Sequence, residues 1–149
     1  MNKRQVNIIL SEHATMPSYA TPLSSGADLY SANDSGIVIP KGGIKLIPTG
    51  IRMELPEDAE GQIRPRSGLS LKKGIIAVMG TIDADYQGEI GIVIQNCGDS
   101  DFVVYKGERL AQIVFNGAGG LFQAHFNEVE EFTRNSERGE GGFGHTGTK

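Results

Sequence analysis

The sequence contains no tryptophan and a single cysteine among its 149 residues. One cysteine, Cys97, excludes an intramolecular disulfide framework and is typical of a reducing compartment. No apolar run approaches the roughly 20 residues that a helix needs to cross a bilayer. The basic start of the chain leads into a strand-like Val6–Leu10 and not into the apolar centre of a signal peptide. We therefore expect a cytoplasmic protein.

Positive charge is also scarce, because 14 Lys and Arg residues face 18 Asp and Glu residues, for a formal net charge of -4. This balance argues against an extended nucleic-acid-binding surface, which normally has a basic excess. It leaves open a small anionic ligand, because a phosphate site needs only a few local donors. Glycine is abundant: its 21 residues are about twice the usual share. We expect a turn-rich protein or a ligand cradle.

Short apolar or alternating runs separated by turn residues predict an all-β domain, a sandwich or barrel. No window has a sustained helical period; one short helix is predicted at Ser67–Lys73, with Ser67 as its cap. The predicted strands are Val6–Leu10, Ala27–Tyr30, Gly36–Ile39, Ile44–Pro48, Ile51–Glu54, Gln62–Pro65, Ile75–Met79, Ile90–Gln95, Phe102–Tyr105, Arg109–Phe115 and Phe122–Val129.

The last stretch differs in composition from the rest of the chain. From Thr133 to Lys149 it is dense in Gly, Ser and charge, and Phe143 is its only large apolar residue. Such a composition is typical of a flexible segment. The sequence thus predicts a β domain at residues 1–132 and a Gly-rich arm at residues 133–149.

The stretch from Met79 to Glu89 places two carboxylates and a tyrosine between two apolar runs. We interpret it as a hairpin whose polar tip is held by a rigid sheet, where functional residues often lie. The alternative is that Asp83 and Asp85 are ordinary turn formers. Asp83 and Tyr86 are three residues apart, so they face one ligand only if the chain turns between them.

Four further segments contain polar groups that call for a role or a partner. Asp28 lies in a strand-like run, and Gln112 interrupts an apolar one; each has the alternative of bonding only to nearby backbone. Pro65–Ser70 combines a guanidinium, a hydroxyl and a glycine at a strand exit, as a phosphate site does, although many turns share this pattern. The Gly-rich run Arg138–Gly147 is either a spacer or an arm that folds over a nucleotide.

Taken in order, these five segments resemble the five sequence motifs of the trimeric dUTP diphosphatases. The segments are Gly26–Tyr30, Pro65–Leu69, Gly80–Gly88, Gly107–Gln112 and Arg138–Gly144. The resemblance implies a jelly-roll subunit in a homotrimer, with each active site assembled from all three chains and closed by the arm. It implies Mg²⁺-dependent hydrolysis of dUTP to dUMP and pyrophosphate, which lowers dUTP and supplies dUMP for thymidylate synthesis. From the charge balance and the lack of a long apolar run, we expect no nucleic-acid or membrane partner.

The resemblance also assigns roles by position. Asp83 matches the catalytic base that orients a water for attack on the α-phosphorus, and Tyr86 matches the residue that packs on deoxyribose and excludes a 2'-hydroxyl. Mg²⁺ is expected to have no direct protein ligand and to be reached through water. The remaining matches are Gly80 and Ile82 for the uracil edge; Arg66, Ser67 and Gly68 for phosphates; Asp28 and Gln112 for the outer shell of Mg²⁺; and Arg138, Phe143 and Gly144 for the arm.

Two positions depart from the family pattern. Ala77 stands where many members have an asparagine that holds the pyrimidine, and His145 stands where a serine is common.

Two other functions are alternatives to dUTP hydrolysis. A dCTP deaminase shares the expected fold but needs an acid/base group such as Glu at the pyrimidine, and only Glu89 lies near the hairpin. A nucleotide-sensing protein would use arm closure to change partners.

Overall fold

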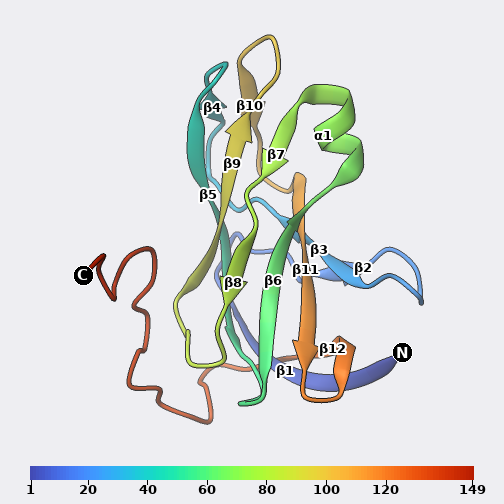
Figure 1. Ribbon diagram of the computed structural model, residues 1–149, viewed down its shortest axis with the longest axis vertical. Helices are drawn as coiled ribbons and strands as arrows, with labels where there is room; N and C mark the ends of the chain where they lie inside the picture. Colours follow the sequence, from blue (N-terminus) through green and yellow to red (C-terminus); the bar gives the residue numbers. More distant parts are fainter.

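The computed structural model describes all 149 residues, and strands dominate it (Figure 1). One sheet of ten strands runs in the order β2-β3-β11-β12-β1-β5-β9-β7, with β6 paired to β11 and to β8; β10 and β4 form a second, two-stranded sheet. The strands are β1 (Asn2–Leu10), β2 (Ser18–Tyr19), β3 (Gly26–Tyr30), β4 (Ile37–Ile39), β5 (Ile44–Glu54), β6 (Ala59–Pro65), β7 (Ile75–Ala77), β8 (Gly80–Ile82), β9 (Glu89–Asn96), β10 (Phe102–Val104), β11 (Arg109–Gly117) and β12 (Gly120–Glu128).

Alternation along the strands builds the core. In β9, Ile90, Ile92 and Ile94 are buried, and the residues between them are more exposed. This period of two places one face of each strand inside the molecule. Twenty-five buried residues form one hydrophobic cluster, and its last member in the chain is Ala124. No core residue therefore comes from the predicted arm. No helix has the length and apolar character of a membrane span.

The predicted helix has the predicted bounds, α1 (Ser67–Lys73), but not the predicted cap. The residue at the cap position is Arg66, in extended backbone, and no side chain bonds the first turn. Ser67 is already the first helical residue, so the prediction that Ser67 caps the helix is wrong. The helix ends at Gly74, whose φ of 65° is readily adopted by glycine and whose N–H bonds the carbonyls of Leu69 and Ser70.

The hairpin predicted around Asp83 is only partly correct. β7 pairs with β9 as expected, with Ala77 opposite Ile94. After Val78 and Met79, however, the chain turns away and forms β8, which pairs with β6 and not with β9. The sequence prediction missed β8 because three residues, one of them glycine, carry almost no periodic signal. The split between β8 and β9 opens the space in which the candidate site lies.

Two other strands differ from the sequence prediction. The runs predicted as separate strands at Ile44–Pro48 and Ile51–Glu54 form the single strand β5, whose pairing with β9 shifts register between Pro48 and Arg52. Gly50 lies in this irregularity with a φ of 67°. The short strand β2 was not predicted. No helix or strand follows Glu128; Figure 1 shows the C-terminal segment leaving the lower end of the sheet and rising beside the loop between β8 and β9.

Candidate functional site

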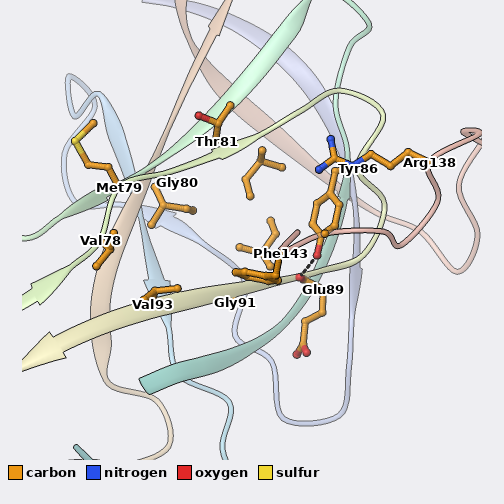
Figure 2. A pocket seen from close by; sticks show the side chains of 14 residues that line it. Val78, Met79, Gly80, Thr81, Tyr86, Glu89, Gly91, Val93, Arg138 and Phe143 are labelled. Atoms are coloured by element: carbon orange, nitrogen blue, oxygen red, sulfur yellow. Dashed lines mark hydrogen bonds between the residues drawn. The ribbon is translucent and has the colours of Figure 1, made fainter. Parts of the chain in front are cut away.

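A cavity of about 330 Å³ lies where β8 separates from β9 (Figure 2). Its walls are Val78 to Ile82 on one side and Ile90, Gly91 and Val93 on the other. The lining is completed by Ile63, Tyr86, Glu89, Arg138, Gly142 and Phe143, so the loop after β8 and the C-terminal segment both contribute. Among the expected uracil-binding residues, Gly80 and Ile82 line the cavity. Ala77 is buried in the core and does not line it.

The loop after β8 turns tightly between Asp83 and Tyr86. The Tyr86 N–H donates to the Asp83 carbonyl at 3.0 Å, which is the turn that the three-residue spacing demanded. The Tyr86 ring is 9% exposed, and its hydroxyl donates to the Glu89 carbonyl at 2.6 Å. Burial raises the pKa of Tyr86, although the charge of Arg138 acts in the opposite direction. Tyr86 is therefore a fixed, neutral wall of the cavity.

Arg138 connects the C-terminal segment to both carboxylates of the loop. Its Nη1 lies 2.5 Å from Asp83 Oδ2 and 3.3 Å from Asp85 Oδ1. Its guanidinium carbon is 5.4 Å from the Tyr86 ring centre. The hydrogen bond to Asp83 is the main reason that the pKa of Arg138 is raised. Asp85 thus shares Arg138 with Asp83.

Phe143 closes the cavity next to Gly91 (Figure 2). Its ring remains 70% exposed, and its φ of 46° is unusual for a non-glycine residue. The segment can approach so closely because Gly142 has no side chain: a Cβ there would lie 2.8 Å from the Tyr86 ring. Gly144, with a φ of 99°, follows Phe143 but does not line the cavity. His145 forms no side-chain hydrogen bond, and its ring lies against Gly141.

A second polar group, the arginine cluster, consists of Asp28, Arg66, Arg109 and Gln112. The Asp28 side chain is 13% exposed and lies 3.3 Å from Arg66 Nε and 3.4 Å from Arg109 Nη1. Gln112 is directly opposite Asp28 in the β3–β11 pair, and its amide donates to the Pro65 carbonyl at 3.1 Å. Asp28 therefore holds two cations at the exit of β6.

The predicted site residues thus fall into two groups within one chain. Tyr86, Arg138 and Phe143 line the cavity with Gly80 and Ile82, and Asp83 is bonded to Arg138 without lining the cavity itself. None of Arg66, Ser67, Gly68, Asp28 and Gln112 lines it. Ser67 and Gly68 are exposed at the start of α1, and a Cβ added at Gly68 would meet nothing within 4 Å. The packing of this chain therefore does not explain why position 68 is glycine.

The described side chains form no group of three or more His, Cys, Asp or Glu residues able to hold a metal ion. Asp28 and Gln112 offer one carboxylate and one amide side by side on neighbouring strands. Two oxygen-bearing side chains are too few to enclose Mg²⁺, which prefers six oxygen ligands and keeps several waters. The pair fits contacts made through metal-bound water.

Comparison with known proteins decides the family. The chain matches the dUTPase family model over residues 12–147. The chain belongs to the dUTPase family. It is 47% identical over 140 residues to the deoxyuridine 5'-triphosphate nucleotidohydrolase of Syntrophotalea carbinolica, covering 93% of this chain and 92% of that protein. It is 46% identical over 151 residues to the enzyme of the same name from Rickettsia akari, covering 99% of both chains.

Solved structures of family members have the same jelly-roll fold. The dUTPase of Staphylococcus bacteriophage 80alpha with dUpNHpp is 29% identical and has a TM-score of 0.71 over 97% of this chain and 99% of that one. A mutant dUTPase of phage phi11 of S. aureus, in which a structural Mg(II) ion is coordinated, is 26% identical with a TM-score of 0.71, over 88% and 100% of the two chains. The family resemblance seen in the five segments is confirmed.

Sequence reasoning missed several residues that build this site. Arg109 stands inside the fourth family-like segment and Gln87 inside the third, but neither was given a role. Arg52 and Glu54 lie in β5, far from any motif, and both bond the C-terminal segment. The one available signal was that charged side chains are unusual in a strand with so many buried neighbours.

Proposed function

We propose that this protein hydrolyses dUTP to dUMP and pyrophosphate, with Asp83 as the base that orients the attacking water. The observation that carries the proposal is the cavity between β8 and β9, where Tyr86 and the Asp83 loop meet the C-terminal arm. Its size and largely apolar lining suit a nucleoside, and the acidic pair at its edge supplies a proton acceptor.

The uracil is read by the backbone of β8. This strand is hydrogen-bonded on one edge only, to β6, and its other edge faces β9 across the cavity. Free N–H and C=O groups on that edge are strong, fixed donors and acceptors. They match the alternating donor and acceptor groups of a pyrimidine edge. The Tyr86 ring, immobilised by its bond to Glu89, then packs on the sugar and leaves no space for a 2'-hydroxyl.

Substrate binding releases Asp83 for its role. Arg138 donates to the carboxylates of Asp83 and Asp85. A triphosphate is a stronger partner for a guanidinium than these two exposed carboxylates, because it offers more charge and several acceptor oxygens. Arg138 therefore moves to the phosphates, and Asp83 becomes free to accept a proton from water. An ordinary Asp has a pKa of about 3.9, so its contribution is mainly to position the water.

Mg²⁺ bound to the triphosphate supplies charge stabilisation at the phosphates. Asp28 and Gln112 would hold the ion through its waters, and Arg66, Ser67 and Gly68 would bind the phosphates. Because these residues do not line the cavity of their own chain, another copy brings its arginine cluster to the cavity in a homotrimer with shared active sites. The open space beside Gly68 supports this proposal, since phosphate oxygens can approach its backbone N–H there. A cytoplasmic location, proposed from the single cysteine, fits a nucleotide-metabolising enzyme.

The test is to incubate the protein with dUTP and Mg²⁺ and to measure pyrophosphate and dUMP, with UTP and dTTP as competing substrates. We expect turnover of dUTP alone, and a loss of 10²-fold to 10⁴-fold in kcat for Asp83→Asn, the range of general base catalysis. Binding of a non-hydrolysable dUTP analogue should survive this substitution. Asp99→Asn, at an exposed position outside both clusters, is the matched control. Equal turnover of UTP or dTTP would exclude the proposed selectivity.

No observation favours the two other functions. A deaminase needs its acid/base group at the pyrimidine, but the Glu89 carboxylate accepts the Gly50 N–H at 2.8 Å and points away from the cavity (Figure 2). Release of ammonia from dCTP would reverse this conclusion.

A sensing role predicts partner proteins that bind this protein only when a dUTP analogue is present. A pull-down with and without the analogue measures such binding.

A further inference from the structure

Arg109 and Gln112 belong to one strand and to one polar group, the arginine cluster, although they are three residues apart. Side chains at that spacing on a regular strand point to opposite faces of the sheet. In the pairing of β11 with β3, the two-residue step from Arg109 to Ala111 corresponds to a step of one residue in β3, so β11 contains a β-bulge. The bulge redirects Arg109, whose Nη1 lies 3.4 Å from the Asp28 carboxylate.

The second cation of the arginine cluster also depends on this bulge. Arg66 Nη1 donates to the Arg109 carbonyl at 3.2 Å, and Arg66 Nε lies 3.3 Å from the Asp28 carboxylate. The backbone at Arg109 therefore carries one guanidinium directly and holds the other through its carbonyl oxygen. A shift of the bulge would move both cations relative to Asp28.

Ser31, a fully buried residue that directly follows β3, holds the turn that leads into the bulge. Its N–H donates to the Glu108 carbonyl and its carbonyl accepts the Gly107 N–H, each at 2.9 Å. Its hydroxyl donates to the Tyr105 carbonyl at 2.6 Å and accepts the Glu108 N–H at 3.1 Å. Four hydrogen bonds from one residue thus fix the turn immediately before Arg109. The main-chain bonds are open to any residue, whereas the two hydroxyl bonds require the side chain of Ser31.

We propose that Ser31 is a positioning residue for phosphate binding: its hydroxyl fixes the turn between β10 and β11, and the bulge after that turn places Arg109 and Arg66. This inference rests on the proposed function, in which the phosphates bind at the arginine cluster. Ser31 touches no substrate and takes part in no chemical step. Without its hydroxyl the turn gains conformational freedom, so substrate binding has to order the two arginines and becomes weaker.

The main test measures affinity for a non-hydrolysable dUTP analogue with Mg²⁺. Ser31→Ala should weaken binding of the analogue roughly tenfold and leave binding of deoxyuridine, which has no phosphate, unchanged. In a chain that also carries Arg66→Ala and Arg109→Ala, Ser31→Ala should change analogue affinity less than about twofold, because a residue that acts through the arginines has no effect without them. An undiminished loss in that chain, or an equal loss for deoxyuridine, would overturn the proposal.

Thr49→Val is the matched control for loss of a buried hydroxyl. Thr49 is also fully buried, and its hydroxyl donates to one carbonyl and accepts one N–H, but the partners are Ile90 and Ile51 and not the turn. Any loss of affinity in Thr49→Val should be equal for deoxyuridine and the analogue, and it should persist in the chain without the two arginines. A loss confined to the analogue would show that the effect of Ser31→Ala is not specific to the turn.

Gly107→Ala alters the same turn without changing the core, so it decides the question if Ser31→Ala does not fold. Gly107 has a φ of 82°, which is strained for alanine, and a Cβ there would meet nothing within 4 Å. We expect the same selective weakening of analogue binding. Unchanged analogue affinity in Gly107→Ala would show that the turn does not position the arginines.

Amide hydrogen exchange separates this proposal from the proposed function. The Glu108 N–H, which is bonded to the Ser31 hydroxyl, should exchange roughly tenfold faster in Ser31→Ala and at an unchanged rate in Thr49→Val. Unchanged exchange in Ser31→Ala would overturn the role of the hydroxyl in the turn. If the unaltered protein neither binds the analogue nor hydrolyses dUTP, the proposed function fails, and the exchange rates still decide whether Ser31 holds the turn.

Discussion

Two charged groups of the chain have opposite net charge: the cavity cluster, which consists of Asp83, Asp85 and Arg138, and the arginine cluster. The cavity cluster combines two aspartates, 52% and 59% exposed, with one arginine that comes from the arm. The arginine cluster combines one aspartate, Asp28, which is 13% exposed, with Arg66 and Arg109. Two arginines beside a single aspartate suit a polyanion better than one arginine beside two aspartates. We infer that most of the phosphate recognition lies outside the cavity of one chain, with Arg138 as the cation that the cavity contributes.

Removing the arm should produce the largest effect, because it takes away Arg138 and Phe143 together. A chain truncated after Phe132 should lose about 100-fold or more in kcat/KM for dUTP, since correct placement of reacting groups is worth that much. It should remain folded, because the hydrophobic cluster ends at Ala124. Steady-state kinetics and circular dichroism check both points. A chain ending at His145 is the control; full activity after truncation at Phe132 would mean that the arm is no lid.

Arg66→Ala tests whether the arginine cluster binds phosphate. Charge-assisted hydrogen bonds contribute about 1.5–3 kcal/mol, so we expect KM for dUTP to rise roughly 10-fold to 100-fold. Affinity for deoxyuridine, which has no phosphate, should not change. Arg4, whose exposed ion pair is with Asp58, provides the control variant Arg4→Ala. Equal losses for the nucleoside and the triphosphate would show that the two clusters do not divide the substrate as proposed.

Substitution of Glu54 should have the smallest effect, on the free energy of unfolding, and tests how the arm is attached to the sheet. Burial alone would raise the pKa of Glu54, but hydrogen bonds from Asn7, the Arg134 N–H and Thr133 outweigh burial and lower it below its ordinary value of 4.5. A lowered pKa in the folded state stabilises the protein above about pH 4.5, and this stabilisation is lost as the pH falls through the lower folded value.

The unaltered chain should therefore exceed Glu54→Gln in free energy of unfolding by about 2 kcal/mol near pH 7. Below pH 4.5 the difference should shrink as Glu54 takes up its proton. Denaturant titrations of both chains at several pH values measure this difference in the free energy of unfolding. Because the two chains share all other carboxylates, the contribution of those carboxylates cancels in the comparison. A difference that stays constant down to pH 3 would contradict the lowered pKa.

Much of this arrangement was predictable from local pattern. Alternating runs such as Ile90–Ile94 predict strands because a half-buried sheet imposes a period of two. The bounds of α1 were also predictable, whereas its cap was not, because a serine next to an extended arginine looks the same in sequence whether it precedes or begins the helix. The five motif-like segments indicated the family before any fold was known. The order and spacing of the five segments indicate the family, whereas any single segment is weak evidence for it.

The loop around Asp83 shows the limit of local reasoning. The spacing of Asp83 and Tyr86 already requires a turn between them, since side chains three residues apart on a strand face opposite ways. The departure of β8 from β9 to β6 could be known only from the folded chain, because strand pairing depends on partners distant in sequence. That departure creates the cavity and leaves one edge of β8 free. It also brings Gln87 within reach of an arm that begins almost fifty residues later, with its amide bonded to Arg134 across 47 positions.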